Sequence, residues 1–196
     1  MRRKYFILIV FFLLTLLHPW SSLAQTKCLC LTWAFIIAGV GGPDRVLDVT
    51  KEPVIHLGER LRIVIKPSTH CDVYLFRLDS RGELNILCSI RGYTDIELPR
   101  EGEWFKVDQT TGIETYYLLA TVYELDALEK AVKIYAEKPK STEAKESVMV
   151  EFEKARRTYL EPHVKEEGVQ IKGLSGEATR VNAGMFYTKT VQIRHE

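Results

Sequence analysis

The chain has 196 residues, of which 46% are hydrophobic and 27% are charged, as in an ordinary globular protein. Its net charge is +1, and it has no basic stripe interleaved with aromatic residues. These features argue against a nucleic-acid-binding protein.

Residues 1–24 have the features of a secretory signal peptide. Arg2-Arg3-Lys4 gives a positive start, and an apolar run follows from Tyr5 to Leu17. Ser22 and Ala24 are small residues placed before a cut after Ala24. The run is shorter than the ~20 residues that a membrane-spanning helix needs, so an uncleaved anchor is the weaker alternative. We therefore expect an exported protein, periplasmic or extracellular, with no stable membrane span after cleavage. Residues 25–196 are expected to form one domain.

Strands are predicted through the first half of this domain. Cys28–Gly42 is apolar and ends in glycines, which favours a buried first strand. Gly39 and Gly41 do not continue into a dinucleotide fingerprint, because Pro43-Asp44 follows, and no cofactor is expected. Further strands, separated by turn residues, are predicted at 46–54 (a short edge segment), 61–66, 96–99, 103–107 and 114–122.

A β-hairpin is predicted at the centre of the sheet, with strands at 71–78 and 84–90. If Asp79 pairs with Gly82 across the turn, Val73 lies opposite Cys88 and Leu75 lies opposite Ile86. Both faces of this strand pair are partly apolar. We therefore expect a second sheet to cover one face and a helix or loop to cover the other.

Helices are predicted after the strands. Residues 124–135 change to a helical pattern, and a longer helix at about 142–160 begins at Ser141 or Thr142. Its apolar stripe consists of Ala144, Val148, Phe152, Ala155 and Tyr159. The polar stretch 168–184 is predicted to be a loop, and 185–194 a closing strand. The predicted fold is mainly β (α+β overall), an immunoglobulin-like antiparallel β-sandwich with one or two flanking helices.

A diffuse pattern runs through residues 55–125. It consists of Gly58-Glu59-x-Leu61-x-Ile63, Tyr74-Leu75, Asp79-x-x-Gly82, Leu87, Leu98-Pro99, Phe105, Gly112-x-Glu114 and Leu119-Ala120. The pattern resembles the bacterial family named domain of unknown function 4384. The resemblance implies a β-sandwich-like module that is frequently exported, is often joined to caspase-like peptidase or kinase domains, and has no established activity. Where the family usually has an aromatic residue followed by proline, this chain has Cys88-Ser89.

Cysteines and histidines are the first candidates for chemistry. Cys71 and Cys88 share a face of the predicted hairpin as diagonal neighbours, so a disulfide between them is the candidate pairing in an oxidising compartment. The alternative is that they are buried free thiols. A zinc site from Cys28, Cys30, His70 and Cys71 has a poor one-residue gap, and no metal is expected. The remaining histidines, His56, His163 and His195 among them, are predicted to be exposed to solvent.

Aromatic residues offer the candidate binding surface. Tyr74, Phe76, Trp104 and Tyr117 lie on strands predicted to be neighbours, and core packing is the alternative. Hydrolase and zinc-protease motifs are absent from the sequence. We therefore predict an exported, non-catalytic module that binds an unidentified protein partner or acts as an envelope scaffold. The alternative is a small exported hydrolase or thiol-redox protein with an acid or cysteine site on the sandwich.

Overall fold

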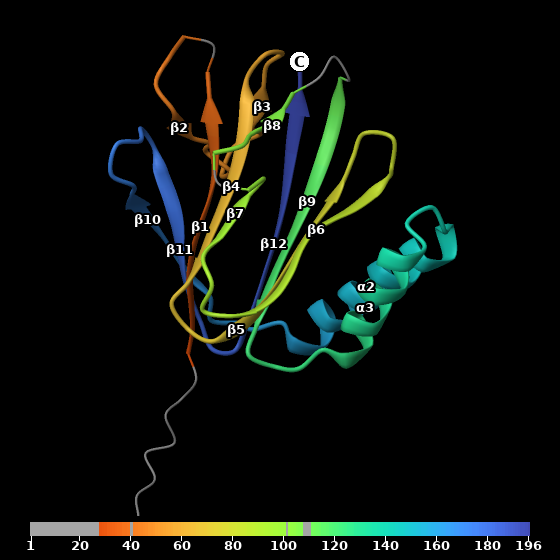
Figure 1. The fold of residues 1–196 in the computed structure, drawn as a ribbon. Coiled ribbons are helices and arrows are strands. Elements are labelled where there is room, and N and C mark those ends of the chain that lie inside the picture. The colour runs from red at the N-terminus through yellow and green to blue at the C-terminus, as the bar shows by residue number, and fades with distance from the viewer. Residues whose placement is uncertain (1–27, 40, 101, 108–110) are drawn as a thin grey trace, which may run out of the picture.

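A computed structural model describes residues 28–39, 41–100, 102–107 and 111–196. The predicted signal peptide, residues 1–24, lies outside the described residues. Two sheets make up most of the fold (Figure 1). Sheet A has the strand order β10 (Lys165–Gln170), β11 (Glu177–Ala183), β1 (Leu29–Ala38), β4 (Arg60–Pro67) and β7 (Ile96–Leu98), with β2 (Arg45–Val46) beside β1 and β8 (Phe105–Lys106) beside β4.

Sheet B has the strand order β3 (Val54–Ile55), β12 (Phe186–His195), β9 (Gly112–Thr121), β5 (Cys71–Leu78) and β6 (Leu84–Gly92). Its pairs are antiparallel apart from β3, which runs parallel to β12. The expectation of a mainly β fold built on two largely antiparallel sheets is therefore confirmed.

The main core lies between the two sheets, because alternate residues of each strand point inward. Sheet A contributes Leu31, Trp33, Phe35, Ile37, Leu61, Ile63 and Ile65, and sheet B contributes Val73, Leu75, Tyr116, Leu118, Ala120 and Ile193. Trp33 also donates its indole N–H to the Tyr187 hydroxyl at 3.1 Å. The inner faces thus pack as a β-sandwich, with one buried polar link between the sheets.

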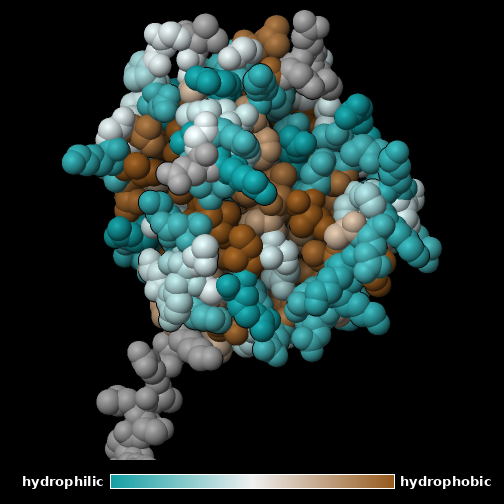
Figure 2. Space-filling view, in the orientation of Figure 1, coloured by the Kyte–Doolittle hydropathy of each residue, from teal (hydrophilic) through white to brown (hydrophobic). Residues whose placement is uncertain are grey.

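Two helices cover the outer face of sheet B. They are α2 (Asp126–Glu137) and α3 (Thr142–Tyr159), and Figure 1 shows them side by side, away from sheet A. The Ser141 hydroxyl accepts the N–H of Ala144 and caps α3, as predicted. Phe152 of α3 is fully buried against Phe76 and Tyr117. Figure 2 shows hydrophilic residues along the outward side of the helices. The central hairpin strand β5 is therefore covered on both faces, as expected.

The predicted register of the hairpin is wrong. Gly82 does donate its N–H to the Asp79 carbonyl at 2.9 Å, but the Asp79 N–H donates to the Glu83 carbonyl at 3.0 Å, because the loop has three residues and ends in Gly82 at φ 80°. Leu78 thus pairs with Leu84 and Phe76 with Ile86. A bulge then shifts the pairing again, so that Leu75 lies opposite Cys88 and Cys71 opposite Gly92. As a result Leu84 and Ile86 face the helices, and Cys88 faces the other sheet.

The predicted loop at 168–184 is also wrong. This stretch contains the end of β10 and the whole of β11. β11 buries Ala178 on the outer face and Val181 and Ala183 on the inner one, so its sequence shows no alternation. No helix among the described residues is long and apolar enough to cross a membrane.

Candidate functional site

The four aromatic residues predicted to form a binding face do not lie on one surface. Tyr74 and Phe76 are 3% and 0% exposed, and they lie under α2 and α3. Tyr117 is half-buried against Phe152, with ring centroids 5.5 Å apart. The expected exposed row is therefore wrong for these residues, because the helix pair covers them. Trp104 lies elsewhere, half-buried on the outer face of sheet A.

The predicted disulfide is also wrong: Cys71 and Cys88 are free and buried. In the observed register Cys88 pairs with Leu75, four residues along β5 from Cys71. Burial raises the pKa of the Cys71 thiol to about 11 and that of Cys88 to about 12. Both thiols are thus protonated near neutral pH, which does not suit a nucleophile or a redox cysteine. Among the described residues, no three His, Cys, Asp or Glu side chains gather closely enough to hold a metal ion.

The outer face of sheet A is hollowed because small residues stand in its middle strands. Ala34 of β1 pairs with Val64 of β4, and Ala178 of β11 pairs with Val169 of β10. The valines pack against these buried alanines together with Trp104, Ile171 and Leu174, and a groove that Ala34 and Val64 line remains between them. The cavity has a volume of about 290 Å³, and Ile171 extends its apolar lining. We call this feature the sheet A groove.

The charges that line the sheet A groove are all positive: Lys66, Lys172 and Arg180. Lys66 pairs with Thr32, which pairs with Arg180 on the next strand, so two cations lie at one level of the sheet. Lys66 Nζ is 3.7 Å from Asp95 Oδ2, but both side chains are more than half exposed. Such an exposed ion pair contributes little to stability, so the carboxylate of another molecule can readily take the place of Asp95 beside Lys66. The groove is therefore apolar along its floor and cationic at its rim.

Trp104 extends this face toward β8. The Arg62 guanidinium lies 4.1 Å from the centroid of the Trp104 ring, and that of Arg60 lies 5.5 Å away. Arg62 also pairs with Glu97 at 2.9 Å. These contacts fix the indole against the sheet, so Trp104 is the one predicted binding residue that borders an uncovered face.

A second feature is a polar pocket between the sheets, at the end of the sandwich where β12 ends. Three inward-facing rows of sheet B each finish there in a polar residue. Val73 and Leu75 on β5 lead to Arg77, Leu118 and Tyr116 on β9 lead to Glu114, and Val191 and Ile193 on β12 lead to His195. The pocket has a volume of about 110 Å³. Its other wall is apolar and comes from Leu61, Phe105 and Val107.

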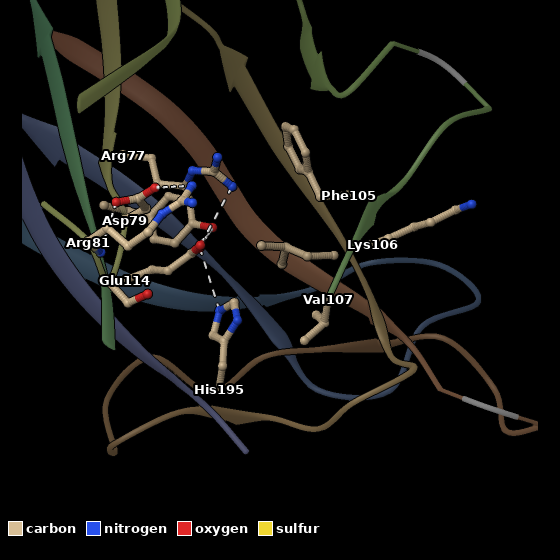
Figure 3. Close-up of a pocket in the computed structure, with 11 residues that line it drawn as sticks. Arg77, Asp79, Arg81, Phe105, Lys106, Val107, Glu114 and His195 are labelled. Carbon is tan, nitrogen blue, oxygen red and sulfur yellow. Dashed lines mark hydrogen bonds and ion pairs between the residues drawn. The ribbon is translucent and has the colours of Figure 1, made fainter. Parts of the chain in front are cut away.

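Glu114 is the centre of this polar pocket. Tyr116 donates its hydroxyl to Glu114 Oε2 at 2.7 Å, and burial, added to the adjacent carboxylate, raises the pKa of Tyr116 well above its usual value. Arg77 Nη1 lies 3.7 Å from Glu114 Oε1, and His195 Nε2 lies 3.5 Å from Oε2. The dashed lines of Figure 3 join Glu114 to Arg77 and to His195. One carboxylate thus holds three partners inside the sandwich.

Catalysis would need more than this set of residues. Ser80 also lines the pocket, so a hydroxyl, an imidazole and a carboxylate occur together. His195 Nε2 has no hydrogen-bond partner, however, and it faces Glu114 at ion-pair distance. A serine nucleophile needs a base within hydrogen-bond reach, and that contact is missing here.

His195 was predicted to be exposed, but its side chain is only 11% exposed. The sequence predicts neither Arg77 nor Glu114 as a site residue, and Glu114 enters only through the Gly112-x-Glu114 part of the family pattern. The sequence does show their position in the alternation of each strand. Arg77, Glu114 and His195 each lie two residues from a buried residue, and therefore on the inward side of the strand. A charged residue that continues the inward-facing apolar residues of a strand marks the point where the buried part of the strand ends, at solvent or at a polar pocket.

Comparisons of the chain with models of known protein families, with curated proteins and with solved structures gave no match. The resemblance to the domain of unknown function 4384 family therefore stays a prediction.

Proposed function

We propose that this protein is an exported, non-catalytic binding module that holds an acidic, extended segment of a partner protein in the sheet A groove. The observation that carries the proposal is the lining of the groove, where the charged residues are Lys66, Lys172 and Arg180 beside an apolar floor. Two acids lie next to these cations outside the lining, Asp95 beside Lys66 and Glu167 opposite Arg180. A segment with alternating apolar and acidic side chains matches this arrangement. Its apolar residues would contact Val64 and Ile171, which are half-buried, and its carboxylates would reach Lys66 and Arg180.

The position of the groove supports this proposal. The helices cover sheet B, and no helix of the described residues packs on the outer face of sheet A, where Trp104, Ile171 and Leu174 cover part of the strands (Figure 1). Export rests on the predicted signal peptide at residues 1–24, which lies outside the described residues. The immunoglobulin-like type of the sandwich is likewise part of the proposal, and the two-sheet architecture is compatible with it.

Site-specific photo-crosslinking in the source cells tests this function. A photoreactive amino acid replaces Val169 in the groove and, as the matched control, Val150, which is 61% exposed on α3. We expect a discrete crosslinked partner from position 169 alone, with mass spectrometry placing the crosslink in an acidic segment. A crosslink to a basic segment, or the same products from both positions, would contradict the proposal.

Charge reversal shows whether the cations carry recognition. The variant Lys66→Glu, Lys172→Glu, Arg180→Glu changes the groove, and Lys133→Glu, Lys154→Glu, Arg157→Glu makes the same change on the helices. We expect the groove variant to reduce the yield of the crosslink about tenfold, because each lost attraction becomes a repulsion. The helix variant should keep the yield. Equal yields in the two variants would overturn the assignment of the groove.

A further inference from the structure

The outward-facing side of β4 carries cations at a regular spacing. Leu61, Ile63 and Ile65 point into the core, so the alternate residues of the strand point outward. These outward residues are, in order, Arg60, Arg62, Val64 and Lys66. Alternate residues of a strand lie about 6.7 Å apart, so Arg60 and Lys66 are separated by about 20 Å. The sheet A groove takes in only Val64 and Lys66, and the row continues beyond it.

Arg60 is the exposed cation at the far end of this row. It lies directly opposite Lys106 of β8, whose side chain is also exposed. Like charges at directly opposed positions of a strand pair repel each other, and a carboxylate placed between them would relieve that repulsion. Within the part of the chain that the structure describes, neither side chain takes part in an ion pair. This end of β4 therefore offers two accessible cations to an acidic group.

Trp104 holds the arginine side chains between the two ends of the row. The Arg62 guanidinium carbon lies 4.1 Å from the centroid of the indole ring, and that of Arg60 lies 5.5 Å away. Such contacts are attractive and restrict the motion of the guanidinium groups. Arg62 also pairs with Glu97 at 2.9 Å, so its charge is engaged, whereas the indole is partly exposed. The middle of the row thus presents apolar and aromatic surface, and its two ends present charge.

We infer that the acidic segment bound at the sheet A groove lies along β4 and carries two acidic residues six positions apart, with apolar residues at the two alternate positions between them. One acid meets Lys66, and the other meets Arg60 and Lys106. The apolar residues contact Val64 and Trp104. An extended segment has the same two-residue repeat as β4, so its alternate side chains stay in step with those of the strand. This inference rests on the proposed function and specifies the pattern of residues that the face selects.

Two peptides of identical composition test the spacing. The matched peptide is Ser-Glu-Thr-Val-Thr-Phe-Thr-Glu-Ser with both ends blocked. The shifted peptide, Ser-Glu-Thr-Val-Thr-Phe-Glu-Thr-Ser, moves the second acid by one position, which turns its carboxylate to the opposite side of an extended chain. The backbone amide signals of Arg60 and Lys66 are followed in the ¹⁵N-labelled protein by nuclear magnetic resonance at constant ionic strength. We expect saturable shifts at both residues, with a dissociation constant of about 1 mM for the matched peptide and about fivefold weaker binding of the shifted one.

A double-mutant cycle assigns the second acid to Arg60. Arg60→Gln removes the cation, and Arg157→Gln makes the same change at an exposed arginine of α3. A third peptide has glutamine in place of the second acid of the matched peptide. We expect Arg60→Gln to weaken the matched peptide about fivefold and to leave the affinity of the glutamine peptide within about twofold. Arg157→Gln should change neither affinity. Lys106→Gln provides an independent second variant at the opposed position and should also weaken the matched peptide alone.

Several results would overturn the inference. Equal affinities of the matched and shifted peptides would do so, as would an equal loss from Arg60→Gln with the matched and the glutamine peptide. Absence of saturable shifts up to about 10 mM of the matched peptide would also do so. The crosslink from position 169 tests the proposed function separately. An acidic segment recovered there without the six-residue spacing would contradict this inference and leave the proposed function standing, whereas recovery of no acidic segment would contradict the proposed function whatever the peptides show.

Discussion

Replacement of Phe152 tests whether the helix pair and the sandwich form one cooperative unit. Phe152 is 0% exposed, and its ring makes edge contacts with Phe76 and Tyr117 at centroid distances of 5.9 and 5.5 Å. A buried phenylalanine removes roughly 200 Å² from water, worth about 5 kcal/mol at ~25 cal/mol per Å². Measured costs of replacing phenylalanine by alanine in cores are about 3–5 kcal/mol. We therefore expect Phe152→Ala to lower the free energy of unfolding by about 4 kcal/mol.

Urea unfolding followed by two probes provides the assay. Trp33 and Trp104 lie in or beside sheet A, so their fluorescence reports the sandwich, with Trp20 replaced by phenylalanine. Far-ultraviolet circular dichroism reports α2 and α3. In the parent protein the two transitions should coincide, and Phe152→Ala should move both to lower urea by the same amount.

Two controls on α3 separate packing from helix formation. Val150→Ala changes a side chain that is 61% exposed on the same helix, and it should alter stability by no more than about 0.5 kcal/mol. Phe152→Leu keeps most of the volume and should cost about 1.5 kcal/mol. The reasoning fails if Phe152→Ala costs less than about 1 kcal/mol, or if it lowers the helical transition and leaves the fluorescence transition in place. In that case the helices would not be coupled to sheet B.

Two further predictions concern titrating groups. Burial alone would raise the pKa of Asp79, but hydrogen bonds from the backbone N–H groups of Glu83 and Arg81 and from the Arg81 side chain outweigh it and lower that pKa. The stability that Asp79 provides is thus present above its unfolded pKa of about 3.9 and is lost as pH falls through the lower native value. Asp79→Asn should be less stable than the parent at neutral pH, and the difference in unfolding free energy should shrink in acid; a constant difference would count against this account. A thiol reagent at neutral pH should label exposed Cys28 in the native protein but reach Cys71 and Cys88 only after unfolding, and rapid native labelling of Cys88 would show that its burial is wrong.

The elements that the sequence predicts well are those whose apolar period is strong. Residues 61–66 alternate and form β4, and the stripe containing Val148 and Phe152 is buried on α3. The stretch 168–184 is predicted to be a loop because the buried residues of β11 lie on both faces, Ala178 on the outer one and Val181 and Ala183 on the inner one, which gives no alternation. The hairpin was found with the wrong register, since one residue in the turn and one in the bulge each shift the pairing, and neither changes the apolar content of the strands.

The candidate sites were harder to predict for a related reason. Tyr74 and Phe76 project from the outer face of sheet B, and the sequence indicated an outward aromatic row there. Which face the predicted helices would cover depends on tertiary packing that no local pattern encodes, and they cover this one. The pocket around Glu114 needs three strands whose ends meet, and these strands lie far apart along the chain. The sheet A groove depends on the contrast between Ala34 and Val64 across a strand pair, which becomes visible only once the register is known.

The order of strands in the two sheets has a consequence for how the chain folds. β1, near the beginning of the described residues, lies in the interior of sheet A and pairs with β11, about 150 residues later. β12, the last strand, lies between β3 and β9 in sheet B. Sheet A therefore needs β11 and sheet B needs β12 before either sheet is complete. Pairings between strands so far apart in the sequence make folding slow. Until β12 docks between β3 and β9, the edges of these strands remain unpaired, and unpaired strand edges are prone to aggregation.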